Sequence, residues 1–191
     1  DWIVTLMDAI KNIINRASHK KLIKPFPNKD EMKLVYKAAL RAPDHRNLKP
    51  SRFIEVKGKG LTKLSNIFLD YASNNIPNIT ASKLIKIKNA PFRAPMIVVL
   101  ISKITKHPKV PKIEQMLSTG AAAQNMLLTL NALGYGGIWR TGSLALNSKI
   151  CKYFDLNKND EIIGYLYIGT SEDKTKKITK LNIDDYVKKW M

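Results

Sequence analysis

The chain has 191 residues and a mass of 21.6 kDa, which is enough for one domain with a sizeable hydrophobic core. Apolar residues make up 45% and charged residues 25%, and this balance excludes a wholly disordered chain. The longest unbroken apolar run, Met96 to Ile101, is far too short to cross a bilayer. We therefore expect a single domain over residues 1–191 with no transmembrane helix.

The amino terminus and the single cysteine both bear on where in the cell the protein resides. The amino terminus carries acidic residues and lacks the basic region, apolar run and cleavage site of a signal peptide. The one cysteine, Cys151, cannot form an internal disulfide, which is typical of a reducing compartment. We expect a cytoplasmic protein that does not associate with membranes.

The net charge of +18 comes mostly from lysines, which are spread over the whole chain together with many asparagines and isoleucines. Nucleic-acid-binding proteins usually concentrate their charge and favour arginine where bases or phosphates are bound in pairs of hydrogen bonds. The densest cluster has no aromatic residue within it: Lys174, Lys176, Lys177 and Lys180. The pattern favours coding bias over a dedicated nucleic-acid surface, and a basic nucleic-acid-binding domain stays the alternative outside the enzyme class.

The first half of the chain predicts several helices and two strands. Three- and four-residue apolar spacing predicts a helix over 2–14, and a capping box of Asn28 and Glu31 opens a second helix that Pro43 ends. A polar loop over 44–50 precedes a short strand over 53–56. Helices are expected over 61–73 and up to residue 88. The β-branched run Met96–Ser102 predicts a strand buried on both faces.

The second half begins with a long helix over about 113–133, which ends at Gly134 in the position of a helix C-cap. Its small residues at 120–123 allow another backbone to approach closely. A glycine-rich segment (136–142), a short helix (147–154), a buried strand (162–168) and a polar tail (178–191) follow. Helices and strands mix without strict alternation, which predicts an α+β domain with a central sheet.

The enzyme motifs that are easiest to recognise are absent from the sequence. There is no glycine-rich nucleotide fingerprint after a strand, no phosphate-binding loop and no nucleophile elbow. The histidines at 19, 45 and 107 do not have zinc-ligand spacing, so we expect no metal. If the protein is an enzyme, a bound organic cofactor must carry the chemistry.

Three polar segments suit such a cofactor, although each also has a plain structural reading as a helix end, a loop or a turn. Arg16 and Ser18 can bind a phosphate at the end of the first helix. The proline-bracketed loop over 41–50 offers donors in a stiffened backbone to the edge of a heterocycle. The glycines of 136–142 allow close approach to a ligand, and Arg140 can meet an anion there. A fourth segment, 89–95, is interpreted as structural.

Taken in order and spacing, these segments resemble the FMN-dependent nitroreductase family, and within it the small bacterial NAD(P)H nitroreductases. The resemblance runs from about Met7 to Thr170, so that residues 1–6 are a possible extension. Its most specific stretches are Arg-Ala-Pro-Asp-His (41–45), Asn-Ala-Pro-Phe-Arg-Ala-Pro (89–95), Lys-Val-Pro (109–111) with Glu-Gln (114–115), and Gly-Gly-Ile-Trp-Arg (136–140).

The resemblance implies an α+β nitroreductase-like fold, with a central, mainly antiparallel sheet flanked by helices, in an intertwined homodimer with FMN at the subunit interface. It implies an oxidoreductase in which hydride passes from NAD(P)H via FMN to a nitroaromatic, a quinone or a similar small electron-poor acceptor by a ping-pong mechanism. A specialised flavin enzyme with another physiological reaction is the alternative within the same fold.

The family's binding positions carry over residue by residue, and no side chain is expected to act as the catalytic group. Arg16, Ala17 and Ser18 would hold the phosphate and ribityl end of FMN, and Arg41 and His45 would reach the flavin from the partner subunit. The other positions expected to contact FMN are Asn47, Trp139, Arg140 and Thr141. The positions expected to bind NAD(P) are Thr129, Leu130, Asn131, Ala132, Leu133 and Gly134.

Three residues depart from the family pattern. Ala17 stands where a second basic residue is common, which removes one phosphate contact. Lys49 replaces the usual glutamine before Pro50, and Ser51 replaces the aromatic residue that usually follows it. A cationic Lys49 beside the flavin would favour anionic reduced FMN or acidic substrates.

Overall fold

The computed structural model describes residues 8–173 and 178–191. The first part of the helix predicted over 2–14, including Ile3, Leu6 and Met7, lies outside the described residues. Lys174, Lys176 and Lys177 of the lysine cluster lie outside them as well.

The centre of the molecule is a five-stranded sheet whose strands all pair in antiparallel fashion. Its strands are β1 (Leu22–Ile23), β2 (Ser51–Lys57), β3 (Met96–Ser102), β4 (Gly136–Arg140) and β5 (Glu161–Ser171). The order is β1-β5-β3-β2, and β4 also pairs with β5. β2 therefore lies at one edge of the sheet, separated from β4 by β3 and β5. This confirms the expected antiparallel α+β architecture.

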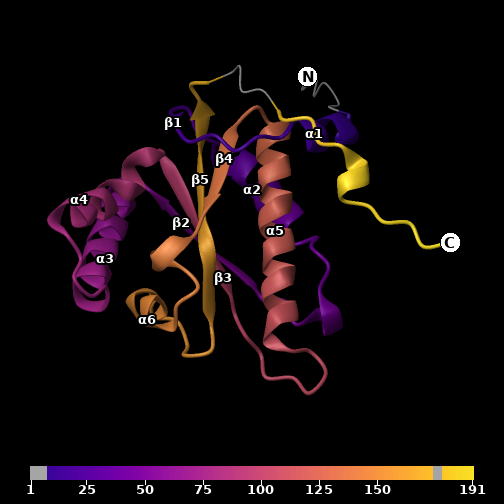
Figure 1. The fold of residues 1–191 in the computed structure, drawn as a ribbon. Helices are drawn as coiled ribbons and strands as arrows, with labels where there is room; N and C mark the ends of the chain where they lie inside the picture. Colours follow the sequence, from indigo (N-terminus) through magenta and orange to yellow (C-terminus); the bar gives the residue numbers. More distant parts are fainter. Residues whose placement is uncertain (1–7, 174–177) are drawn as a thin grey trace.

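Helices cover both faces of this sheet (Figure 1). They are α1 (Ala9–Asn15), α2 (Lys29–Ala39), α3 (Lys59–Asn75), α4 (Ala81–Asn89), α5 (Lys112–Ala132) and α6 (Ser148–Cys151). Short 3₁₀ turns are η1 (His45–Asn47), η2 (Ala90–Arg93), η3 (Gly142–Leu144), η4 (Lys152–Phe154) and η5 (Ile183–Asp185). Figure 1 shows α3, α4 and α6 on one side of the sheet and α2 and α5 on the other.

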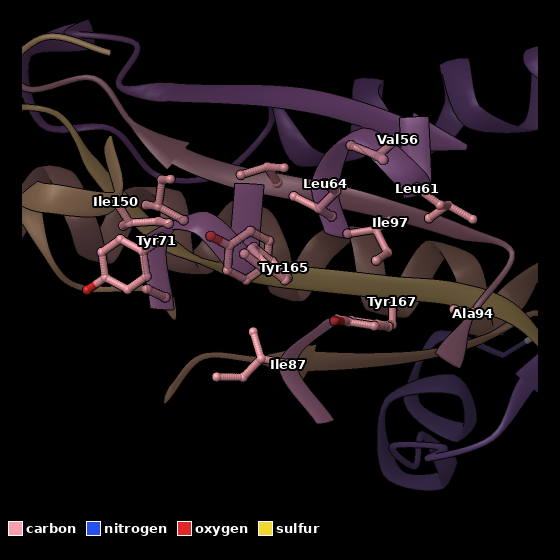
Figure 2. Packing of buried hydrophobic residues seen from close by; sticks show 14 of the residues in the cluster. Val56, Leu61, Leu64, Tyr71, Ile87, Ala94, Ile97, Ile150, Tyr165 and Tyr167 are labelled. Carbon is pink, nitrogen blue, oxygen red and sulfur yellow. The ribbon is translucent and has the colours of Figure 1, made fainter. Parts of the chain in front are cut away.

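Two hydrophobic clusters follow from this arrangement, one on each face of the sheet. Every residue of β3 is buried, and alternate side chains serve alternate faces: Ile97 and Val99 join one cluster, while Val98 and Leu100 join the other. Figure 2 shows the first cluster, in which Leu64 and Tyr71 of α3 lie around Ile97 and Tyr165. The second cluster buries α5 and α2 against the opposite face, and so places α5 across the sheet.

The helix ends agree with the sequence where local chemistry decides them. The Asn28 side chain accepts a hydrogen bond from the Glu31 N–H at 3.0 Å, and the Glu31 carboxylate accepts one from the Asn28 N–H at 2.8 Å. This confirms the capping box. After α5, Gly134 adopts a φ of 84°, the left-handed conformation expected of a residue that closes a helix.

The structure corrects two local predictions. The glycine-rich segment is mostly strand β4, and only Gly142 has a positive φ within it. Gly136 and Gly137 are needed for close packing. A Cβ at Gly136 would lie 2.9 Å from Leu22 Cδ2, and a Cβ at Gly137 would lie 2.8 Å from Leu127 Cδ2. The helix predicted over 147–154 is divided into α6 and η4. No helix in the described part of the chain is both long and apolar enough to cross a membrane.

Candidate functional site

The predicted phosphate-binding residues lie where the chain leaves α1. Arg16 caps the carboxyl end of α1, and its Nη1 lies 3.4 Å from Ser18 Oγ. Ser18 forms a parallel bridge with Gly137, and the His19 N–H donates to the Gly137 carbonyl at 3.3 Å. Arg16, Ala17 and Ser18 are half-buried, and they lie alongside the beginning of β4.

The other end of β4 carries the second predicted group, Trp139, Arg140 and Thr141. The Trp139 indole N–H donates to the Ile163 carbonyl at 3.1 Å, so its ring is held against β5. Gly164 makes room for this indole, because a Cβ there would clash with its Nε1, whereas a Cβ at Gly120 would lie 3.6 Å from its Cη2, an ordinary contact distance. Thr141 is exposed directly after the strand.

Arg140 is the most unusual of these residues. Its guanidinium carbon lies 5.3 Å from the centre of the Tyr167 ring, within the range of a cation–π contact. Its Nε is buried and has no hydrogen-bond partner among the residues that the structure describes. A buried donor without an acceptor costs about 1–3 kcal/mol, so the position favours an acceptor that comes from outside the described residues.

Tyr167 supports this cation in its neutral form. Burial raises the pKa of Tyr167 to about 12, and the nearby guanidinium groups of Arg140 and Arg93 lower it only in part. The phenol therefore stays protonated at neutral pH and presents a ring face, not a negative charge, to Arg140. The Arg140 charge is left available to an anion.

The predicted heterocycle-binding loop lies at the opposite edge of the sheet, between α2 and β2. It is held in an unusual conformation, because Arg46, Asn47 and Lys49 have φ values of 63°, 52° and 50°. Such left-handed residues cost energy and need surrounding contacts to hold them. Those contacts are present: the Asp44 carboxylate accepts from the Leu48 N–H at 3.1 Å and from the Lys49 N–H at 2.7 Å.

Two further side chains fix this loop from outside. Arg52 Nη1 donates to the Lys49 carbonyl at 2.7 Å and to the Ser51 carbonyl at 2.8 Å. His45 Nδ1 lies 2.6 Å from a Glu114 carboxylate oxygen in the first turn of α5. The loop is therefore tied to both β2 and α5.

The loop forms the wall of a cavity of about 420 Å³. The predicted residues Arg41 and Asn47 line it, but His45 does not. Its full lining is Ala39, Leu40, Arg41, Ala42, Pro43, Asp44, Asn47, Lys49, Pro50, Ser51 and Ser118. This cavity is large enough for part of a flat, drug-sized molecule.

One chain does not bring the two groups of predicted residues together. The loop contacts Glu114 at one end of α5, whereas α1 is held near the other end, where Asn131 Nδ2 donates to Asn12 Oδ1 at 2.7 Å. Glu114 and Asn131 are 17 positions apart in this helix, which corresponds to about 25 Å. The loop and β4 are also on opposite edges of the sheet (Figure 1).

The segment predicted to bind NAD(P) forms the last turn of α5 and its end. Leu130 is fully buried in the core, and Asn131 holds α1. Thr129 Oγ1 donates back to the Asn125 carbonyl within the helix. Asn131 and Gly134 nevertheless line a cavity of about 330 Å³ together with Ala17. The structure therefore places residues 129–134 beside the predicted phosphate-binding residues Arg16–Ser18, and not beside the 41–50 loop.

Several residues that shape the site were not identified from the sequence. Asp44 and Glu114 lie in stretches that resemble the family, but nothing in the sequence shows that their carboxylates hold the 41–50 loop in its conformation. Arg52 and Tyr167 have no local signal at all, because their partners come from other elements. Ser118 is buried in α5 and lines the loop cavity.

The chain combines an antiparallel sheet covered by helices on both faces with two groups of polar residues at opposite edges of that sheet. The sequence model of the "Nitroreductase family" matches residues 13–170. The chain belongs to this family, whose members are oxidoreductases.

Individual relatives agree with that assignment. The chain is 36% identical over 180 residues to "Putative NAD(P)H nitroreductase YdjA" of Escherichia coli (strain K12), which covers 94% of this chain and 96% of that protein. The crystal structure of a nitroreductase-like family protein from Bacillus cereus superposes with a TM-score of 0.81 at 21% identity, covering 96% of each chain. A nitroreductase with bound FMN from Bacteroides fragilis NCTC 9343 has a TM-score of 0.73 at 15% identity, covering 96% of this chain and 99% of that one.

Proposed function

We propose that this protein is an FMN-dependent NAD(P)H oxidoreductase that reduces nitroaromatics, quinones or similar electron-poor acceptors by a ping-pong mechanism. The observation that carries the proposal is the buried Arg140 Nε, which lacks an acceptor among the described residues and ends the strand β4, whose beginning is bridged to the half-buried Arg16–Ser18 segment. The name of the YdjA relative and the FMN in the B. fragilis structure give the same cofactors for those proteins.

The donors of this chain fit FMN. Arg16 and Ser18 would bind the phosphate, with the Ala17 backbone between them. Arg140 would donate a hydrogen bond from its buried Nε–H and would supply a positive charge. Trp139 and Thr141 would line the cofactor site at the same end of β4. Residues 129–134 would receive the nicotinamide nucleotide, an assignment supported by the cavity that Asn131 and Gly134 share with Ala17.

When bound, FMN supplies the two-electron redox chemistry. For a nitro acceptor the balanced reaction is R–NO₂ + NAD(P)H + H⁺ → R–NO + NAD(P)⁺ + H₂O. The chain's own residues bind and orient: Arg16, Ser18 and Arg140 hold the anionic cofactor, and the rigid 41–50 loop presents Arg41 and Asn47 toward a ligand. No side chain has to act as the sole acid or base.

The same proposal includes a homodimer, because the loop and the β4 group are too far apart to share one cofactor within a chain. A second copy would bring its Arg41, His45 and Asn47 to the first copy's Arg140. The exposed apolar residues of α1 support this: Ile10, Ile13 and Ile14 are 66%, 51% and 61% exposed. Ile113 and Leu117 are exposed at the other end of α5, so apolar side chains that a partner subunit would cover lie near both ends of this helix.

The test is the visible absorbance spectrum of the purified protein with added FMN, followed by NADPH without oxygen. A bound-flavin spectrum that bleaches on NADPH addition, with colour restored by a nitroaromatic or quinone, supports the proposal. Bleaching without restoration by either acceptor would point to a specialised flavin enzyme. A colourless protein that binds DNA tightly in low salt would refute the flavin assignment. Sedimentation of the loaded protein tests the dimer.

A further inference from the structure

Lys49 is the cation of the loop cavity that the proposed cofactor site does not use. It is exposed, and its side chain has no hydrogen bond or ion pair within residues 8–173 and 178–191. Arg41, the other cation of the cavity lining, likewise has no side-chain partner there. The cavity therefore holds two positive charges on one wall.

The acidic residues near this wall do not neutralise it. Asp44 is the one carboxylate of the lining, and both of its oxygens accept backbone N–H groups, from Leu48 and Lys49. Glu114 faces the loop from α5, but it is paired with His45 at 2.6 Å. The overall charge of +18 adds to the positive potential. An anion is the ligand that this cavity attracts.

The position of Lys49 is held by the fold at a cost. Lys49 has a φ of 50°, although a lysine has no intrinsic preference for that conformation. The Asp44 carboxylate binds its N–H, and the Arg52 guanidinium binds its carbonyl, so both sides of the residue are fixed. Strain maintained in this way is characteristic of positions that orient a functional side chain.

Ser51 contributes only a short side chain to the cavity lining that it shares with Lys49. Ser51 lines the cavity, and its Oγ lies 3.4 Å from Thr119 Oγ1 on α5, which leaves its short side chain against the helix. Ser118 of α5 adds a hydroxyl to the same lining. A cavity of about 420 Å³ has room for one aromatic ring with a carboxylate, and its lining offers apolar atoms at Ala42 and Pro43 and a cation at Lys49.

We propose that Lys49 makes this cavity selective for electron acceptors that carry a carboxylate. The inference rests on the proposed function, since it names the acceptor class of that same site. The Lys49 ammonium would donate a charge-assisted hydrogen bond to the carboxylate, while the electron-poor end of the acceptor faces the cofactor. The redox balance is the one given above, with R bearing the carboxylate.

The experiment compares 4-nitrobenzoate with the neutral 4-nitrobenzamide as acceptors for the FMN-loaded protein. The ratio of their kcat/KM values is measured in the wild type, Lys49→Gln, Lys49→Arg and the matched control Lys37→Gln, an exposed lysine of α2 outside the cavity. We expect the ratio to fall about tenfold in Lys49→Gln, the size of one charge-assisted hydrogen bond. It should stay near the wild-type value in Lys49→Arg and in Lys37→Gln.

A binding measurement gives a readout that does not depend on turnover. Calorimetric titration of the FMN-loaded protein with benzoate should show a dissociation constant raised about tenfold in Lys49→Gln, and benzamide should show no such difference. An unchanged acceptor ratio together with unchanged benzoate binding would overturn the inference.

The remaining outcomes distinguish acceptor selectivity from a role of Lys49 in nucleotide binding, from a general effect on the flavin and from failure of the proposed function. A loss in kcat/KM for NADPH as large as that for nitrobenzoate would assign Lys49 to the nucleotide phosphates and overturn an acceptor role. Equal losses for both acceptors would mean a general effect on the flavin and would overturn it too. If neither acceptor is reduced by any of the proteins, the proposed function fails, and benzoate binding alone decides whether the cavity selects carboxylates.

Discussion

The guanidinium carbon of Arg140 lies 5.3 Å from the centre of the Tyr167 ring, and the Nε of the same group is buried without a partner in the described part of the chain. The first relationship stabilises the fold, whereas the second destabilises it. The Arg140 side chain is held in place by Tyr167, and its buried Nε–H can donate to a bound ligand. The cost of the unsatisfied Nε, about 1–3 kcal/mol, is comparable with the ~1–2 kcal/mol expected of a cation–π contact on a buried ring.

Arg140→Met should therefore separate stability from cofactor binding. Without FMN, we expect the free energy of unfolding to change by less than about 1 kcal/mol, because removal of the unsatisfied donor offsets the loss of the cation–π contact. The dissociation constant for FMN should rise at least about tenfold, because a charged hydrogen bond is lost. Urea unfolding with and without FMN measures both, with Lys37→Met as the charge control. Equal FMN affinity in Arg140→Met and the wild type would remove Arg140 from the site.

The phosphate assignment is tested by the double variant Arg16→Ala, Ser18→Ala. Loss of one charged and one neutral hydrogen bond should weaken FMN binding about 100-fold. Riboflavin, which has no phosphate, should bind the wild type and the double variant equally. The control is Lys11→Ala, an exposed residue of α1 that removes the same charge nearby. If FMN still binds the double variant better than riboflavin by the wild-type margin, other residues hold the phosphate.

Two glycines face the Trp139 indole and predict opposite effects of alanine. At Gly164 the new Cβ would lie 2.0 Å from Trp139 Nε1 and 2.9 Å from the Arg140 carbonyl, so the indole must leave its hydrogen bond to Ile163. We expect Gly164→Ala to cost about 3 kcal/mol or more and to weaken FMN binding.

Gly120→Ala is the matched comparison on α5. Its Cβ would meet Trp139 Cη2 at 3.6 Å, an ordinary contact, and alanine favours the helix by up to about 1 kcal/mol. Urea unfolding should show a gain in stability for this variant. A loss as large as that of Gly164→Ala would show that the indole and α5 are closer than the structure places them.

Asp44 should control the conformation of the loop. Asp44→Ala leaves the N–H groups of Leu48 and Lys49 without their acceptor while Lys49 still needs a positive φ. We expect the free energy of unfolding to fall by about 1–3 kcal/mol. Asp44→Asn keeps one carbonyl acceptor and should lose roughly half as much. Similar stabilities for the wild type and Asp44→Ala in urea unfolding would contradict this role.

The stability of the protein should depend on Tyr167 at high pH. Burial raises the pKa of Tyr167 to about 12, so between pH 10 and 12 the unfolded chain loses this proton while the folded chain keeps it. The free energy of unfolding must then decrease as pH rises through this window, by up to about 3 kcal/mol, and be unaffected below it.

Comparison with phenylalanine variants isolates that contribution from the titration of the lysines. Tyr167→Phe should have a shallower decrease in stability between pH 10 and 12 than the wild type. Tyr186→Phe, at a residue 70% exposed, should keep the wild-type slope. Identical slopes in all three proteins would mean that Tyr167 titrates normally.

The sequence by itself determined the elements whose causes are local. β3 was predicted over its observed residues because Met96–Ser102 is continuously apolar, and a strand buried on both faces needs such a run. The capping box at Asn28 and the glycine end of α5 followed from side-chain chemistry within a few residues. The family was also evident from the sequence, since its stretches occur in order along the chain.

Only the tertiary structure decided how the site is built, because its contacts join residues far apart in sequence. β1 has two residues, too few for a pattern, and exists through its pairing with Thr170 and Ser171. β4 forms because glycines let it pack tightly on Leu22 and Leu127. The strained lysine at 49, the unsatisfied Arg140 Nε and the separation of the two binding groups along α5 depend on long-range packing, which no local pattern of residues encodes.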